Sequence, residues 1–264
     1  MYKEYWELKE KPFENTPDPR FLYRSPQHEE ALFRLIYVVR EGKGAGMLTG
    51  VFGCGKTVLG RALCKELEKD VYRVGFVNNP RLEDVDLLRM IAYQLGSVEL
   101  PDRKTDILIA LEKLLTDNIK DNKKTVIVID EAHTIEDKDI FEELRLLLNF
   151  QLEDRFLLTL LLLGQPELNK KIEENKQLTQ RIALRYHLEG LNQEDTVCYI
   201  KHRLEVAGGE GGTFPPATVG LVFERTGGIP RRINQICDMC LFTGFAKKVK
   251  IIDEEIVREA INSL

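Results

Sequence analysis

The stretch Gly50-Val51-Phe52-Gly53-Cys54-Gly55-Lys56-Thr57 decides the fold class. It fits G-x-x-x-x-G-K-[ST], the pattern of a phosphate-binding loop. A short apolar run at 45–49 precedes it, as a buried strand would, and apolar residues at helical spacing follow it at 58–67. Since such a loop joins a strand to a helix, both flanks agree with the motif. The sequence therefore predicts a nucleotide-binding α/β domain.

The residue types in this loop match the chemistry of phosphate binding. Glycines let successive backbone N–H groups turn inward around the phosphates, at the positive end of the following helix. Lys56 is expected to reach the β- and γ-phosphates, and the Thr57 hydroxyl is expected to bind Mg²⁺. Cys54 would contribute its backbone, with a reactive thiol as the alternative. The residues predicted to bind ATP are Gly50, Gly53, Cys54, Gly55, Lys56, Thr57, Val58 and, farther along the chain, Asp130.

Predicted strands and helices alternate through the first two thirds of the chain. Apolar runs at 71–77, 125–129, 156–163 and 183–188 indicate four further strands. Every residue in the run at 125–129 is β-branched, which is typical of a strand buried on both faces. Helical patterns lie between the strands at 84–95, from after Pro101-Asp102 to about 119, and at 139–150. The alternation predicts a P-loop NTPase fold, α/β, with a five-stranded parallel sheet and helices on both faces.

Two acidic residues end the central apolar strand. The Asp130 carboxylate would hold Mg²⁺ through its water shell, and Glu131 would polarise the attacking water as a general base. A solvent-facing acidic pair at a strand end is the alternative. The metal site predicted from these residues is Thr57 with Asp130. His133 would couple Glu131 to the γ-phosphate or to a partner, and an ordinary surface histidine fits the pattern equally well.

Further polar residues are candidates for contact with the phosphates. Gln165 ends the next strand, where it would contact the γ-phosphate or the water, and a loop amide without a role is the alternative. Phosphoryl transfer also needs positive charge on the transition state, usually from an arginine finger. Arg181 and Arg185 are one candidate pair. Arg231 and Arg232, at a predicted helix start, are another.

The two ends of the chain differ from its centre. Residues 1–24 are rich in aromatics and prolines and predict an extended arm packed on the body, beside the nucleotide base in one interpretation. Residues 25–190 form the predicted nucleotide-binding domain. From residue 191 only helical patterns occur, at 195–206, 216–226, 230–246 and 253–262, which predict a small helical lid domain.

Composition is that of an ordinary soluble protein, with 43% hydrophobic and 31% charged residues in 264. No targeting segment is evident, and the longest apolar run, 156–163, is too short to span a bilayer. Five scattered cysteines fit a reducing cytoplasm, and Cys237 with Cys240 are expected to pack in a core rather than bind metal. A net charge of −5 argues against an extensive basic surface for nucleic acid, although it leaves a local basic face open.

The whole set resembles the AAA+ ATPases, and specifically the ATPase module of the ExeA/GspA group of secretion-associated proteins. The resemblance is based on the arm Leu8-Lys9-Glu10-Lys11-Pro12-Phe13, continuing to Tyr23, and on Gly164-Gln165-Pro166-Glu167-Leu168. Gln180-Arg181-Ile182 and 227–234 belong to the same resemblance, which extends over essentially the whole chain. The module is also similar to the TnsC/TniB regulators of DNA transposition.

The resemblance implies roles for individual residues. It makes Lys56 and Thr57 Walker A, Asp130 and Glu131 Walker B, and Gln165 sensor 1. Arg181 would be the arginine finger, with Arg185 as its rival, and Arg231 would be sensor 2, with Arg232 as its rival. Catalytic function is thus expected of Lys56, Glu131, Gln165, Arg181 and Arg231. The resemblance also implies active sites between the subunits of a ring or filament.

Three functions follow as hypotheses. The first is an oligomeric, cytoplasmic ATPase, using ATP and Mg²⁺ to assemble or remodel a secretion or cell-envelope complex. The second is an ATP-dependent regulator of transposition that binds duplex DNA. Its phosphate contacts would come from lysines in two sets, Lys120, Lys123 and Lys124, and Lys247, Lys248 and Lys250. The third is a nucleotide-gated interaction switch with negligible hydrolysis.

Overall fold

The computed structural model describes residues 2–264, and this part of the chain divides into two compact units. One unit contains residues 30–50 and 59–188. The other contains residues 2–29, the loop at 51–58 and residues 189–264. The predicted boundaries at 24 and 190 remain predictions, and each unit is described below by itself.

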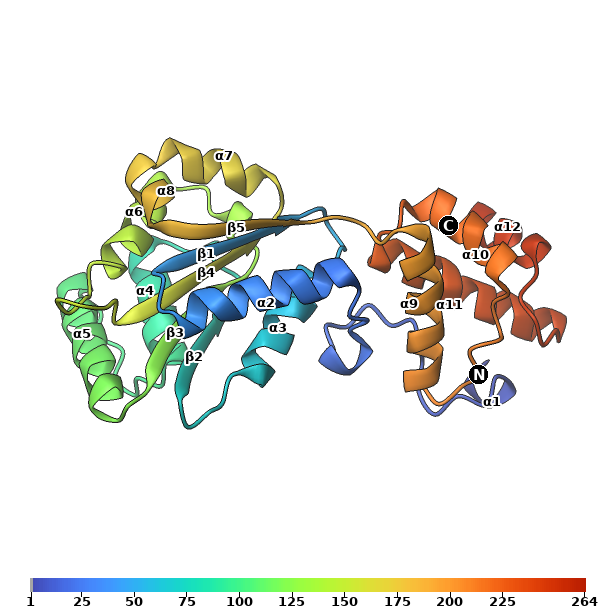
Figure 1. The fold of residues 1–264 in the computed structure, drawn as a ribbon, viewed down its shortest axis with the longest axis horizontal. Coiled ribbons are helices and arrows are strands. Elements are labelled where there is room, and N and C mark those ends of the chain that lie inside the picture. Colours follow the sequence, from blue (N-terminus) through green and yellow to red (C-terminus); the bar gives the residue numbers. More distant parts are fainter. Residues whose placement is uncertain (1) are drawn as a thin grey trace. The chain divides into compact units, whose positions relative to one another are not determined.

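The first unit is built on a parallel five-stranded sheet (Figure 1). Its strands lie in the order β2-β3-β4-β1-β5, and every neighbouring pair is parallel. Their bounds are β1 Ala45–Gly50, β2 Tyr72–Val77, β3 Lys124–Ile129, β4 Leu158–Gly164 and β5 Ile182–Leu188. All five strands occur where the apolar runs predicted them. The predicted fold class is confirmed.

Helices cover both faces of this sheet, which explains why its central strands are apolar throughout. β4 is buried along its whole length, and β3 is buried after its first residue. On one face, Gly46 of β1 lies close to Val38 of α2 (Pro26–Arg40) and to Leu161 of β4, and Gly60 of α3 (Lys56–Glu66) lies close to Leu163 of β4. On the other face, the helices from α4 (Asp84–Gln94) to α8 (Lys176–Arg181) form one core with the sheet, and Leu87, Leu111, Leu144 and Leu178 are among its buried residues.

The helices of this unit match most of the predicted ones. They are α2 Pro26–Arg40 and α3 Lys56–Glu66, which both begin in the other unit, followed by α4 Asp84–Gln94, α5 Lys104–Lys120, α6 Lys138–Leu147, α7 Glu167–Glu174 and α8 Lys176–Arg181, with the short η2 Ala132–Thr134. Pro26 begins α2 directly after Ser25, because proline is tolerated in a first helical turn. Neither α7 nor α8 was predicted, because their surface is mostly polar and they bury only Leu168, Ile172 and Leu178.

The second unit packs the aromatic arm against four helices. These are α9 Gln193–Val206, α10 Pro216–Thr226, α11 Pro230–Lys247 and α12 Glu254–Asn262, and the arm adds α1 Tyr2–Tyr5 and η1 Pro19–Phe21. Trp6, Phe13 and Phe21 are buried in one cluster with Tyr199 and Cys237. The Trp6 indole N–H donates to the Leu241 carbonyl at 2.9 Å. Burying so many aromatic side chains stabilises the arm's packing within this unit.

None of the helices between residues 2 and 264 combines the length and apolarity needed to cross a membrane. Cys237 and Cys240 are fully buried in the core of the second unit, and burial raises the pKa of both thiols. Within the described residues there is no group of three or more His, Cys, Asp or Glu side chains arranged for a metal ion.

Candidate active site

The phosphate loop has the backbone that its glycines were expected to allow. Gly53 and Gly55 have φ values of +87° and +108°, in a region that side chains rarely adopt. The Cys54 N–H donates to the Val51 carbonyl at 3.3 Å, which closes a turn over residues 51–54, here called the loop crest. α3 begins at Lys56, so the N-terminal end of this helix follows the turn directly. The loop is thus shaped as an anion-binding turn.

Lys56 lies inside this loop rather than extending into solvent. Its side chain is buried, and Nζ donates to the Val51 carbonyl at 3.0 Å. This hydrogen bond joins the end of the loop, at Lys56, to its beginning, at Val51. Lys56 therefore holds its ammonium group on the inner side of the turn that is expected to surround the phosphates.

A buried histidine supports the crest of the loop, and sequence reasoning missed it. His28 Nε2 lies 3.1 Å from the Cys54 carbonyl oxygen, and Nδ1 lies 2.7 Å from the Ser25 hydroxyl. Because a carbonyl only accepts, Nε2 carries the proton and Nδ1 accepts from Ser25. Burial lowers the pKa of His28, so the ring is neutral. Burial also raises the pKa of the Cys54 thiol, which argues against a reactive cysteine.

The start of α11 lies against the loop. The Arg231 N–H donates to the Gly53 carbonyl at 3.2 Å, and its guanidinium carbon stands 4.5 Å from the centroid of the Phe52 ring. A Cβ on Gly53 would come within 2.7 Å of the Arg231 Cβ, so the approach requires glycine. Arg232 lines a different hollow with Gln235 and Leu264. Of the two arginines, Arg231 is the one beside the phosphate loop.

A small pocket adjoins the loop within the same unit. Its lining comes from the arm, the loop, α9 and α11: Thr16, Asp18, Phe21, Leu22, Tyr23, His28, Cys54, Gly55, Val58, Tyr199, Arg203 and Pro230. This lining places the arm beside the phosphate loop within the unit. The interpretation that the arm lies beside the nucleotide base stays a prediction.

Arg203 fastens the arm along one side of this pocket. Its guanidinium donates to the carbonyls of Pro12 and Glu14, at 2.5 and 2.9 Å, and to the Tyr199 hydroxyl at 2.9 Å. It also stands 4.7 Å from the centroid of the Phe21 ring. A buried arginine needs several acceptors to offset its desolvation, and the arm supplies two of them. No local sequence pattern could have predicted this contact between distant segments.

The acidic residues occupy the carboxyl end of β3 in the sheet unit. Asp130 is buried, and Glu131 has a left-handed backbone with φ 54° and ψ 32°. The Glu131 N–H donates to Asp130 Oδ1 at 3.0 Å. A left-handed backbone costs a residue with a side chain about 1–2 kcal/mol, so the fold maintains this orientation against local preference.

Gln165 follows β4, the neighbour of β3, so parallel pairing brings it to the same edge as Asp130 and Glu131. Its Nε2 lies 2.9 Å from His133 Nε2. On its other side the His133 ring faces Glu131, with Nδ1 at 3.4 Å from Oε2. The sheet unit thus groups four of the predicted polar residues at one edge.

That edge has the donors that Mg²⁺ prefers. A buried carboxylate at a strand end supplies the oxygen ligand that suits a hard cation, which keeps several waters and shares substrate phosphates. Within the sheet unit, Asp130 would hold such an ion. When bound, the ion would supply positive charge to the phosphate oxygens.

Arg181 lies where the strands begin, at the side of the sheet formed by their amino ends, here called the amino edge. It ends α8 just before β5, whose first residue Ile182 is paired with Ala45, whereas Gly50 at the far end of β1 is paired with Leu188. Arg181 stands over the Phe156 ring, 5.6 Å from its centroid, and donates to Asn149 Oδ1 at 3.4 Å. Arg185 lies in mid-strand opposite Met47, with an ion pair to Glu173 at 3.7 Å.

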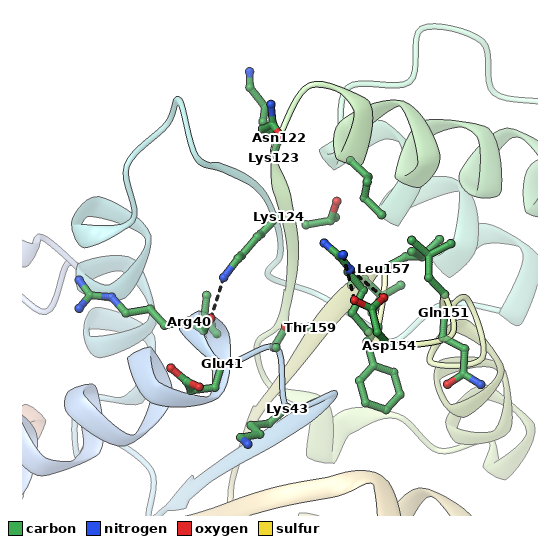
Figure 2. A pocket seen from close by; sticks show the side chains of 18 of the residues that line it. Arg40, Glu41, Lys43, Asn122, Lys123, Lys124, Gln151, Asp154, Leu157 and Thr159 are labelled. Carbon is green, nitrogen blue, oxygen red and sulfur yellow. Dashed lines mark hydrogen bonds and ion pairs between the residues drawn. The ribbon is translucent and has the colours of Figure 1, made fainter.

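The amino edge also contains a large hollow, shown in Figure 2. Its charged lining residues are Arg40, Glu41, Lys43, Lys123, Lys124, Glu153, Asp154 and Arg155. Lys124 Nζ donates to the Arg40 carbonyl at 2.7 Å, and Arg155 pairs with Asp154 at 3.0 Å. Of the other lysines considered for DNA, Lys120 pairs with Asp117, and Lys247 pairs with Glu255 and Glu259.

The fold and these residues define a class. The AAA domain family matches residues 39–172, and the chain therefore belongs to this family. The predicted enzyme class, an ATP hydrolase with the P-loop fold, is confirmed at this level.

Over 253 residues the chain is 38% identical to "General secretion pathway protein A" of Aeromonas hydrophila. The match covers 94% of this chain and 45% of that protein, so the chain spans less than half of the relative's length. The predicted resemblance to the ExeA/GspA group is confirmed.

Solved structures agree on the fold. The Aeropyrum pernix ORC2 protein in its ADPNP–ADP complexes has a TM-score of 0.74 at 19% identity, covering 96% of this chain and 71% of that one. Drosophila ORC bound to DNA has a TM-score of 0.70 at 20% identity, covering 95% and 63%. At identities this low, the TM-scores show a shared fold alone.

Proposed function

We propose that this chain binds and hydrolyses ATP in a homo-oligomer and uses the cycle to assemble or remodel a secretion or cell-envelope complex. The observation that supports the partner class is the 38% identity to General secretion pathway protein A, since it extends over 94% of the chain. The likeness includes the arm and the helical region as well as the phosphate loop. A shared nucleotide-binding core alone would not require that extent.

The roles proposed for the site residues follow from their chemistry. Backbone N–H groups of the loop and Lys56 bind the phosphates, while Thr57 and Asp130 hold Mg²⁺. Glu131 accepts a proton from the attacking water, and Gln165 senses the γ-phosphate. Arg231 lies against the loop crest, which supports it over Arg232 as the residue that reports nucleotide state.

Two substitutions test hydrolysis. We expect Lys56→Ala to abolish ATP binding, because the loop loses the cation aimed at its centre. Glu131→Gln should keep binding and lower turnover by about 10²–10⁴-fold, the usual contribution of a general base. Binding is measured with a fluorescent ATP analogue, and turnover by phosphate release. If turnover in Glu131→Gln equals that of the wild type, another residue activates the water.

The hollow at the amino edge favours a second candidate, ATP-dependent binding of duplex DNA. Five of its charged side chains are cationic and three are anionic, which suits contact with phosphates in part of its wall. Duplex DNA would bind in a salt-sensitive and ATP-dependent manner. Lys43→Ala with Lys123→Ala should lower the slope of log K against log salt by about 2. Absence of binding at low salt, with and without ATP, contradicts this candidate.

A further inference from the structure

A chain of three side chains links the proposed base to the proposed γ-phosphate sensor. His133 lies between them, with Nε2 at 2.9 Å from Gln165 Nε2 and Nδ1 at 3.4 Å from Glu131 Oε2. Its side chain is 13% exposed, and Nδ1 is a buried nitrogen without an aligned hydrogen bond. His133 therefore faces two functional residues at once, and this is unlike an ordinary surface histidine.

The backbone around His133 is fixed by a neighbouring helix. Lys171 on α7 donates to the carbonyls of His133 and Ile135, both at 2.6 Å. The Thr134 hydroxyl and N–H both donate to the Glu131 carbonyl at 2.8 Å. Gly164 is so close that a Cβ there would stand 3.2 Å from the backbone nitrogen of His133. Because the segment is held from several directions, the ring keeps its place between Glu131 and Gln165.

The orientation of the Gln165 amide decides which ring nitrogen holds the proton. When the amide N–H faces the ring, Nε2 must accept it, so the proton of a neutral ring lies on Nδ1 and faces Glu131. When the amide oxygen faces the ring instead, the proton must lie on Nε2. Glu131 then faces a lone pair and loses its donor.

We propose that His133 is a positioning residue that couples Gln165 to Glu131. Without ATP, Gln165 donates to His133, and the Nδ1 proton faces the Glu131 carboxylate. When the Gln165 N–H groups turn to the γ-phosphate, the amide oxygen accepts from Nε2 and the ring proton exchanges to that nitrogen. Glu131 is then free to accept the proton of the attacking water. This inference rests on the proposed function, since it assigns a regulation to the same site.

Imidazole ¹⁵N NMR tests the coupling without any turnover. The chain has four histidines, so the His133 signals are identified by their loss in His133→Gln. Without nucleotide we expect the proton on Nδ1, and with a non-hydrolysable ATP analogue and Mg²⁺ we expect it on Nε2. Gln165→Ala should abolish the difference between the two states. A His133 ring that holds its proton on the same nitrogen in both states overturns the proposal.

Kinetics of substituted enzymes separate coupling from simple packing. Asn at 133 places an amide near the Nδ1 position, and Gln places one near Nε2, so each retains only one of the two contacts. We expect His133→Asn, His133→Gln and His133→Ala each to lower kcat by about 10- to 100-fold with an unchanged KM, as for a misplaced catalytic group. His133→Ala combined with Gln165→Ala should be no slower than Gln165→Ala alone. Full activity in His133→Asn, or additive losses in the double variant, overturns the coupling.

His187→Ala is the matched control. His187 lies in the same unit on β5, where Nδ1 is 3.0 Å from the Thr49 hydroxyl, and it is exposed. It should leave kcat unchanged. If the wild type hydrolyses no ATP, the proposed function fails, while the NMR measurement still decides whether Gln165 controls the His133 proton.

Discussion

At the scale of single residues, the candidate site depends on side chains that serve its backbone. His28 gives the Cys54 carbonyl a buried donor, and Lys56 closes on Val51 across the loop. Neither contact touches a phosphate directly. Both fix the loop before nucleotide binds, and such preorganisation lowers the cost of ordering on binding.

His28 gives stability a dependence on pH. Its pKa is lowered by burial, so as pH falls through the ordinary histidine value of about 6.5 the unfolded chain binds a proton that the folded chain does not. The free energy of unfolding therefore decreases as pH falls through this range and is highest above it. Urea midpoints at about pH 7.5 and pH 5.5 measure the loss.

His28→Gln is the variant that checks this assignment. It removes the titrating group and retains an amide donor near Nε2 for the Cys54 carbonyl. We expect the loss of stability between the two pH values to shrink in this variant. His28→Ala should also weaken the loop, since an unpaired buried acceptor costs about 1–3 kcal/mol. An equal pH dependence in wild type and His28→Gln would assign the effect to another group.

At the scale of elements, the turn between α10 and α11 positions Arg231. Gly227 ends α10 in the left-handed conformation, and Pro230 begins α11. The Leu191 N–H donates to the Gly228 carbonyl at 2.8 Å, which ties the turn to the segment before α9. The element thus sets where the first turn of α11 lies against the loop.

Alanine substitutions at three glycines of the second unit distinguish backbone strain from a steric clash. Gly228 has φ +70°, and a Cβ there would meet the Leu191 oxygen at 1.8 Å, so Gly228→Ala should cost about 2–5 kcal/mol. Gly227 has φ +61° with no atom within 4 Å, so Gly227→Ala should cost about 1–2 kcal/mol. Gly212→Ala, with open space, is the control at about 0.5 kcal/mol or less. Urea unfolding ranks them, and equal losses at Gly227 and Gly228 would contradict the clash.

At the scale of the whole molecule, the sheet separates two groups of functional residues. Asp130, Glu131 and Gln165 follow the carboxyl ends of their strands, whereas Arg181 precedes β5 at the amino edge. The five residue steps of β1 from Ala45, paired with Ile182, to Gly50 span about 17 Å at 3.3 Å per residue, so Arg181 lies about that far from the carboxyl ends of the strands. This separation from Glu131 and Gln165 supports the proposal that Arg181 acts on the nucleotide of another subunit.

Mixed oligomers test that arrangement. Lys56→Ala subunits have an intact Arg181, and Arg181→Ala subunits have an intact phosphate loop, so each is expected to be inactive alone. Random mixing in equal amounts should restore about one quarter of wild-type turnover, since each active interface needs one variant on each side. Arg185→Ala serves as the control and should remain active alone. If mixing restores nothing, Arg181 is not a finger acting between subunits.

The strands and most helices could be predicted from the sequence because their signals are local. The β-branched run of β3 and the glycines and lysine of the loop specify their own conformations or chemistry. α7 and α8 escaped prediction because their few buried side chains occur in a polar segment without a clear period. The sequence indicated Gln165 and Glu131 as candidates and His133 as a possible link from Glu131 to the γ-phosphate, but it did not indicate the contact between His133 and Gln165.

The sequence by itself determined the class of fold, the nucleotide loop and the residue types of the catalytic set. Only the tertiary structure decided which of these residues lie together: β4 pairs with β3, which sets Gln165 beside Glu131, whereas Arg181 precedes the parallel strand β5 and lies at the amino ends of the strands. Likewise, His28 at the loop crest and Arg203 on the arm contact residues far away in sequence. The physical reason is that helix and strand formation depends on neighbours along the chain, whereas strand order and buried polar contacts depend on packing between distant segments.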